Sequence, residues 1–158
     1  MRSEAVARLG PEPLGRAERR EEMKVVTFLV DGRTFATNLG AVREIRSWQQ
    51  TTPLPDTAYH ALGVLNLRGA IIVVYDLRLR LGIMGERPEG TGVIIVVDIG
   101  EICCGLLADS VSDILDVGAD ELRDAPEISG DRNELIEALV VKNDSVITIL
   151  RLSAIPTE

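Results

Sequence analysis

Three aspartates at spacings of four and three residues, Asp109, Asp113 and Asp116, follow an apolar strand-like segment. They could form a carboxylate cluster, and one interpretation is a small β-barrel enzyme that uses it. That interpretation predicts a pocket in which the three side chains converge and have altered pKa values. The alternative is a solvated face or a junction between two subdomains. A calcium loop needs a different pattern with an inner glycine.

The other reactive residue types lack the spacing of a catalytic or metal site. His60, the single histidine, has no nearby cysteine or second histidine, so we expect a surface histidine. Cys103 and Cys104 are adjacent, so in a strand they point to opposite faces and are poorly placed to form a disulfide with each other. We expect one or both to be small core residues, which suits a reducing compartment. No glycine-rich phosphate loop or nucleophile elbow is present. We therefore expect a binding module rather than an enzyme, with neither a metal nor a cofactor.

The composition and the charge limit the possible folds and partners. The 158 residues suit one compact domain or two small halves that share a core. The net charge of −8 is uneven: residues 98–158 carry 4 basic and 14 acidic side chains, and residues 1–97 carry 13 and 11. The acidic half would repel phosphate backbones, which argues against nucleic-acid binding. No signal-peptide core or membrane-spanning run is visible, so we expect a cytoplasmic protein.

Short runs of Val, Ile and Leu between turn residues predict a mainly β chain of about ten strands. The clearest strands are Lys24–Val30, Arg33–Asn38, Ile71–Tyr75, Val93–Ile99, Ile102–Ala108, Leu135–Val141 and Val146–Leu152. Asp31-Gly32 and Asn143-Asp144 are predicted hairpin turns.

Helices are expected to be few and short. We expect one over Thr57–Leu65, capped by Asp56 or Thr57, and another from Asp76. Residues 1–23 contain prolines and mixed charge and are predicted to be a flexible tail before a domain over residues 24–158.

The two halves of the sequence resemble each other. Residues 25–32 match 93–100 at an offset of 68, residues 41–45 match 110–114 at 69, and residues 71–77 match 146–152 at 75. The second match pairs Val42 with Val111, Glu44 with Asp113, and Ile45 with Ile114. The constant order favours a true repeat. We infer two small β-barrels of similar topology that pack tightly, because each is too small to be stable alone.

One turn distinguishes the two repeats. The turn before Ile71 is Arg68-Gly69, whereas its counterpart is the ordinary Asn143-Asp144. A hairpin needs only an ordinary turn such as Asn143-Asp144, so the arginine at position 68 is a candidate functional residue. The structural alternative is a salt bridge from Arg68 to Glu44 or Asp109.

The segment GVLNLRGAIIVVYDLRLRLG (63–82) resembles the signature of CheW-type chemotaxis coupling proteins, a Gly-Val-x-Asn-Leu-Arg-Gly stretch followed by an apolar strand and Asp-Leu-Arg. Three more segments are similar to parts of that family: AVREI (41–45), ADSVSDIL (108–115) and LRDAPE (122–127). The resemblance covers about residues 24–155. It implies two intertwined five-stranded SH3-like β-barrels related by pseudo-symmetry, without catalytic activity.

The resemblance also implies an adaptor that couples chemoreceptors to the histidine kinase CheA at receptor arrays on the inner membrane. The helical cytoplasmic tip of the receptor would dock between the barrels, and the kinase's regulatory domain, itself a similar double barrel, would bind elsewhere. The matched receptor positions are Val42, Glu44, Asn66, Arg68, Val111 and Leu115. For the kinase we predict Ile45, Trp48 and Leu54, because apolar side chains at edges make good anchors.

Two alternatives concern the role of such a barrel. It could couple a related array that controls twitching, development or second-messenger synthesis. It could also be a self-associating structural barrel, whereas a coupler is expected to be monomeric when free.

Overall fold

The protein is a mainly β structure, as predicted. The structure, a computed structural model, describes residues 23–125 and 134–156. The first half forms β2 (Met23–Val30), β3 (Arg33–Asn38), the 3-10 helix η1 (Leu39–Ala41), β4 (Val42–Ser47), β5 (Ala61–Leu67), β6 (Ala70–Asp76) and α2 (Leu77–Arg80). The second half forms β7 (Val93–Ile99), β8 (Ile102–Ala108), β9 (Ser110–Val117), η2 (Ala119–Glu121), β10 (Leu122–Arg123), β11 (Ile136–Lys142), β12 (Ser145–Leu150) and η4 (Leu152–Ala154).

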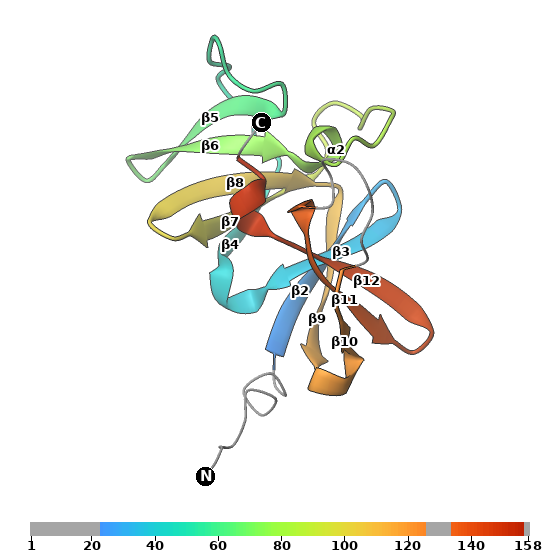
Figure 1. The fold of residues 1–158 in the computed structure, drawn as a ribbon. Helices are drawn as coiled ribbons and strands as arrows, with labels where there is room; N and C mark the ends of the chain where they lie inside the picture. The colour runs from blue at the N-terminus through green and yellow to red at the C-terminus, as the bar shows by residue number, and fades with distance from the viewer. Residues whose placement is uncertain (1–22, 126–133, 157–158) are drawn as a thin grey trace.

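The strands form two sheets that exchange their hairpins. The six-stranded sheet has the order β10-β11-β12-β3-β2-β9, and the five-stranded sheet has the order β4-β7-β8-β6-β5. Figure 1 shows the blue strands β2 and β3 with the red strand β12, and the green strands β5 and β6 above the yellow strands β7 and β8. Each sheet thus combines the first hairpin of one repeat with the last strands of the other. The two repeats are therefore intertwined.

The pseudo-symmetry extends to the pairing of individual residues. Val73 lies opposite Cys104 in the parallel pair β6–β8, and Thr148 lies opposite Phe35 in the parallel pair β12–β3. Val73 and Thr148 are repeat mates at the offset of 75, and Phe35 and Cys104 are mates at 69. The sequence repeat is therefore a structural repeat with the same strand register.

Bulges also occur at equivalent positions. The pairing of β4 with β7 skips Arg43, and the pairing of β9 with β2 skips its mate Ser112. In a regular strand, residues three positions apart point to opposite faces. A bulge adds one residue to the strand, so residues three apart can then lie on the same face. The bulge at Arg43 therefore places Val42 and Ile45 on the same face of β4.

A shared core joins the two sheets. Its largest members include Phe28 and Phe35 from the six-stranded sheet and Ile95 and Leu106 from the five-stranded sheet. Two further clusters fill the individual barrels, one around Val74 and Ile94 and one around Val25 and Ile149. Because the central cluster takes side chains from both sheets, neither barrel can bury its apolar surface without the other.

The helix predicted over Thr57–Leu65 is wrong. Residues 61–67 form β5, which pairs with β6, so long-range strand pairing overrides the local preference. His60, predicted at the surface, is 0% exposed. Its Nε2 donates to the carbonyl of Ile155 (2.8 Å), and its ring contacts Tyr75. The chain end that covers this histidine is 95 residues away in sequence, so local pattern could not reveal the burial.

The predicted tail lies outside the described residues except for Met23, which pairs with Val117 in β9. Residues 126–133, which include the end of the LRDAPE segment, also lie outside them. Among the described residues, no helix is long and apolar enough to cross a membrane.

Candidate protein-interaction site

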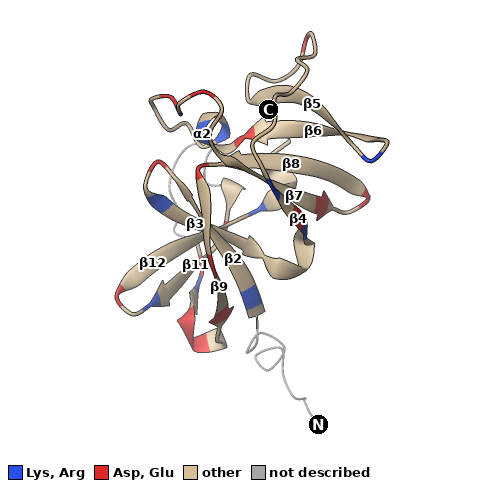
Figure 2. Cartoon of the chain, turned by 180° about the vertical axis from the view of Figure 1, so that it is seen from behind, with Lys and Arg blue, Asp and Glu red and all other residues tan. Residues whose placement is uncertain are grey.

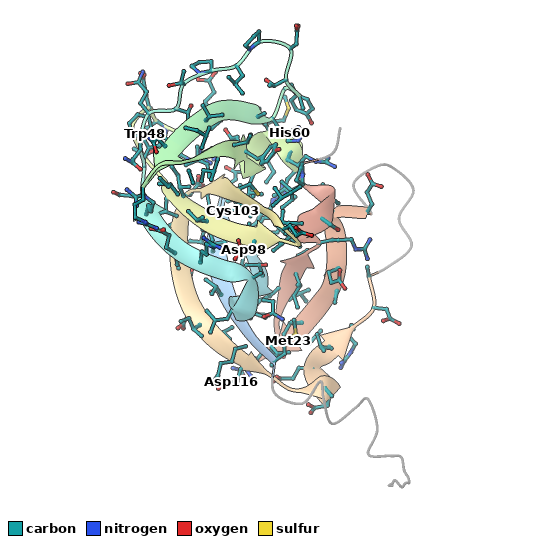
Figure 3. All side chains as sticks on the ribbon, turned by 90° about the vertical axis from the view of Figure 1, so that its left-hand side faces the viewer. Met23, Trp48, His60, Asp98, Cys103 and Asp116 are labelled. Atoms are coloured by element: carbon teal, nitrogen blue, oxygen red, sulfur yellow. The ribbon has the colours of Figure 1, made fainter. Side chains whose placement is uncertain are left out.

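The three aspartates of the enzyme interpretation do not converge. Asp109 lies where β8 meets β9, and Asp116 lies near the far end of β9. The six residues of strand between them separate them by about 20 Å, and Figure 3 places Asp116 near Met23 at one end of the molecule. Asp116 pairs with Lys24 (2.6 Å), and the Oδ1 of Asp113 accepts from the N–H of Ile114 (2.8 Å). The converging pocket expected of an enzyme is therefore absent at these residues.

Asp109 instead ties the connector before β7 to the body of the protein. Its carboxylate accepts from the Arg87 Nε (2.6 Å) and from the backbone N–H of Asp31 (2.7 Å). The Arg87 side chain is only 9% exposed and also lies 3.6 Å from Asp76. Burial acts to raise the pKa of Asp109, but the hydrogen bonds from Asp31 and Arg87 outweigh it and hold this pKa below its ordinary value. No local pattern around Arg87 indicates this role.

The cysteines are free and act as core residues. Cys104 is buried, and burial raises the pKa of its thiol to about 12, so the thiolate is not formed near neutral pH. No group of three His, Cys, Asp or Glu side chains in the described part of the chain could hold a metal ion.

A groove between the edge strands β4 and β9 is the strongest candidate for a binding site. Its volume is about 360 Å³. It is lined by Val26, Leu39, Val42, Ile45, Val111, Ser112, Asp113 and Ile114. The groove thus brings together Val42 and Val111, two of the positions that we assigned to the receptor.

Ile114 is a groove residue that our sequence reasoning did not assign to a partner. Ile114 is 56% exposed, and Ile45, which also lines the groove, is 45% exposed. The signal was available, because Ile114 is the repeat mate of Ile45. Ile45 itself, which we assigned to the kinase, lines this groove.

The tip of the β5–β6 hairpin bonds to the strand that forms one groove wall. Arg68 Nη2 donates to Glu44 Oε2, and Arg46 Nη1 donates to Glu44 Oε1 (3.1 Å). The hydrogen bond from Arg68 is the largest cause that lowers the pKa of Glu44. Of the two structural partners considered for Arg68, the structure has Glu44 and not Asp109. The Arg68 side chain is nevertheless 71% exposed, at the blue tip of the hairpin in Figure 2.

Two further receptor positions have structural roles. Asn66 Oδ1 accepts from the N–H of Gly69 (2.8 Å), which stabilises the turn in which Arg68 has a φ of 51°. Leu115 is half-buried and packs against the core cluster of the six-stranded barrel, and it does not line the groove.

The three kinase positions do not share one cavity. Trp48 packs on the core of the five-stranded barrel and lines a separate pocket of about 300 Å³. Figure 3 shows Trp48 at the end of the molecule opposite Met23. Leu54 is 42% exposed in the loop before β5 and lines neither cavity.

Comparison with known proteins gives the family. The CheW-like domain family matches residues 24–158. The probable chemotaxis protein CheW of Rhizobium etli is 35% identical over 138 residues, which are 87% of this chain and 89% of that protein. The chemotaxis protein CheW of Bacillus subtilis is 30% identical over 140 residues, covering 88% of this chain and 90% of that protein.

A solved structure agrees with this result. The crystal structure of the scaffolding protein TtCheW from Thermoanaerobacter tengcongensis is similar with a TM-score of 0.77 and 26% identity. The similarity covers 82% of this chain and 89% of that chain. With its intertwined sheets, its repeat and the groove between β4 and β9, the chain belongs to the CheW-like domain family.

Proposed function

We propose that this protein is a non-catalytic adaptor that couples chemoreceptors to a CheA-type histidine kinase in bacterial chemotaxis. Family membership supports this role. The observation that carries it is the groove between β4 and β9, where Val42 and Val111 of the two family-matched segments line one cavity. A mostly apolar groove suits the apolar face of a helix, and the receptor tip is the helical partner that the resemblance implies.

The groove and the hairpin tip would serve the receptor together. Val42 and Val111 would contact the receptor's apolar face, while Glu44 and the exposed Arg68 next to it would contact polar groups at the edge. We assign Ile45 to the receptor as well, since it lines the same groove. The shared core makes the two barrels one rigid unit, so the adaptor would transmit a change in relative position rather than a chemical signal.

The kinase would bind away from the groove. Trp48 and Leu54 lie on the five-stranded barrel and its loop, and we propose them as contacts for the kinase's regulatory domain. The bound receptor and the bound kinase would then occupy different surfaces of one molecule, as an adaptor requires.

The setting of this adaptor is also part of the proposal. We place it in the cytoplasm, recruited to receptor arrays at the inner membrane, and monomeric when free. Residues 24–158 would form the coupling domain.

Binding experiments with both partners test the proposed function. The purified chain is titrated by calorimetry with the regulatory domain of a CheA-type kinase and, separately, with a helical-hairpin fragment of a chemoreceptor tip. We expect binding to each partner and a ternary complex when all three are mixed. Lack of association with both at concentrations of about tens of micromolar would contradict the adaptor role.

A further inference from the structure

The pocket of about 300 Å³ beside Trp48 opens into the interior of the five-stranded barrel. Val74, Ile94 and Leu107, which belong to the core cluster of that barrel, line it. Trp48, which follows the end of β4, lines it as well, and so do residues 87–91 of the connector before β7. A narrow opening with an apolar interior suits a single long side chain.

The side chain of Asp76 points into this end of the barrel. Asp76 is the last residue of β6, two residues after Val74, and it lies opposite Leu107 in the parallel pair β6–β8. Residues two apart in a strand share a face, so Asp76 has the same orientation as Val74 and Leu107. Asp76 lines the pocket, and its side chain is 14% exposed. The pocket therefore contains a carboxylate that is largely shielded from water.

The ion pairs around Asp76 leave a negative charge uncompensated. Three carboxylates, those of Asp31, Asp76 and Asp109, share the two guanidinium groups of Arg78 and Arg87. Arg87 Nε lies 2.6 Å from Asp109, whereas Arg87 Nη2 lies 3.6 Å from Asp76, which is too long for a hydrogen bond. Asp76 consequently has the weaker hold on its cation.

Glu89 adds a second carboxylate at the rim of the pocket. It is exposed, it lines the pocket, and it forms no ion pair with any residue of 23–125 or 134–156. The indole of Trp48 offers an apolar surface for an aliphatic chain and attracts a cation at its face. An apolar stem that ends in a positive charge, as in lysine and arginine, matches this lining.

The equivalent end of the six-stranded barrel has a different chemistry. A cavity of about 550 Å³ lies there, lined by Ile149, the repeat mate of Val74. The repeat mate of Asp76 is Arg151, which is already paired with Glu137 (3.1 Å). None of the described residues that line this second cavity is aromatic. The acidic pocket with an aromatic wall thus belongs to one repeat alone.

We propose that the pocket beside Trp48 receives a lysine or arginine side chain from the regulatory domain of the kinase, and that Asp76 and Glu89 select it. The proposal rests on the proposed function, which assigns Trp48 to the kinase, and it names the chemistry of one contact. The stem lies along Trp48, and the charged head pairs with the two carboxylates. A partner that covers the pocket without this side chain removes water from Asp76 and leaves its charge uncompensated, which is costly.

The test compares three variants with the wild-type chain in titrations with the kinase regulatory domain. We expect Glu89→Lys to weaken binding by about ten-fold and Asp76→Asn by about five-fold. Asparagine also caps helices, so Asp76→Asn keeps the cap of α2. Glu86→Lys makes the same charge change as Glu89→Lys in the same connector, but Glu86 does not line the pocket, and we expect less than about a two-fold effect. All three variants should bind the receptor-tip fragment like wild type, which shows that they are folded.

Charge reversal on the partner completes the experiment. The basic residues of the regulatory domain are changed to Glu one at a time, and we expect one of these changes to weaken binding to wild type and to restore binding to Glu89→Lys. The proposal is overturned if Glu89→Lys binds like wild type, if Glu86→Lys weakens binding equally, or if no partner change restores binding. It is also overturned if Glu89→Lys weakens binding of the receptor-tip fragment or changes self-association in sedimentation experiments, because the receptor or a second copy would then occupy the pocket. In all these cases the wild-type chain still binds the regulatory domain and the adaptor role stands; loss of wild-type binding would remove the role itself.

Discussion

At the scale of single residues, exposed and buried arginines have different tasks in this protein. Arg68 forms an exposed ion pair with Glu44 at the hairpin tip. The side chain of Arg87 is only 9% exposed, and it holds Asp109. Exposed pairs contribute about 0–1 kcal/mol to stability, whereas breaking a buried pair costs several-fold more. Arg68 is therefore the arginine that the fold can lose at little cost in stability, which suits the partner contact proposed for it above.

We expect Arg68→Ala to leave the free energy of unfolding close to that of wild type, because the side chain is exposed, and to impair receptor-dependent control of kinase activity. Urea denaturation and a reconstituted kinase assay measure the two effects. Arg43→Ala is the matched control, since Arg43 also forms an exposed ion pair, but with Asp98 instead of Glu44. An unfolded Arg68→Ala variant, or a kinase response equal to that of wild type, would contradict the functional role.

Asp109 makes stability depend on pH in the acid range. The pKa of Asp109 is lower in the folded protein than in the unfolded chain, where it is about 3.9. Its contribution to the free energy of unfolding is therefore present above that value and is lost as pH falls through the pKa of the folded state. We expect Asp109→Asn to be less stable than wild type at pH 7 and to lose less stability between about pH 5 and pH 2. Thermal melts across this range measure the difference. Parallel stability–pH curves for the two proteins would show that Asp109 contributes nothing.

At the scale of elements, bulges and close crossings set the geometry of the site. The strand β5 has a bulge where its pairing with β6 skips Leu62, next to Gly63. Gly63 has a φ of +147°, and the chain at Thr52 crosses so closely that a Cβ on Gly63 would lie 2.3 Å from the Thr52 carbonyl oxygen. This crossing positions the loop that carries Leu54, so the element depends on one glycine.

We expect Gly63→Ala to lower the free energy of unfolding by about 3 kcal/mol, because backbone atoms must move apart. Gly69→Ala is the control: Gly69 also has a positive φ, of +93°, but nothing lies within 4 Å of an added Cβ. It should cost about 1 kcal/mol. Equal losses in chemical denaturation would show that the close crossing at Thr52 has no effect.

At the scale of the whole molecule, the exchange of hairpins makes the barrels interdependent. Each sheet contains strands from both repeats, and the central cluster joins Phe28 of one sheet to Leu106 of the other. Neither barrel should unfold alone. The single tryptophan, Trp48, packs in the five-stranded barrel and can report on it separately.

We expect Ile149→Ala, in the core of the six-stranded barrel, to lower stability by about 2–5 kcal/mol. The transition followed by Trp48 fluorescence should move to lower urea by the same amount as that followed by far-ultraviolet circular dichroism. A fluorescence transition that stays at the wild-type midpoint would show that the barrels unfold independently.

Features that depend on local chemistry can be predicted from the amino-acid sequence alone. Strand-forming residues located the strands, and Asp31-Gly32, Arg68-Gly69 and Asn143-Asp144 marked the hairpins, because these turns need positive φ angles. The internal match revealed the two repeats, and motifs within it indicated the family.

Which strands pair with one another becomes known only from the three-dimensional fold. It assigned residues 61–67 to a strand and buried His60, since their partners lie far away in sequence. It gave Arg68 the partner Glu44 and separated Asp109 from Asp116. Pairing between distant strands minimises buried unpaired backbone groups and exposed apolar surface over the whole chain, and no local pattern contains that information. The groove between β4 and β9 exists for this reason, as a product of two strands that belong to different repeats.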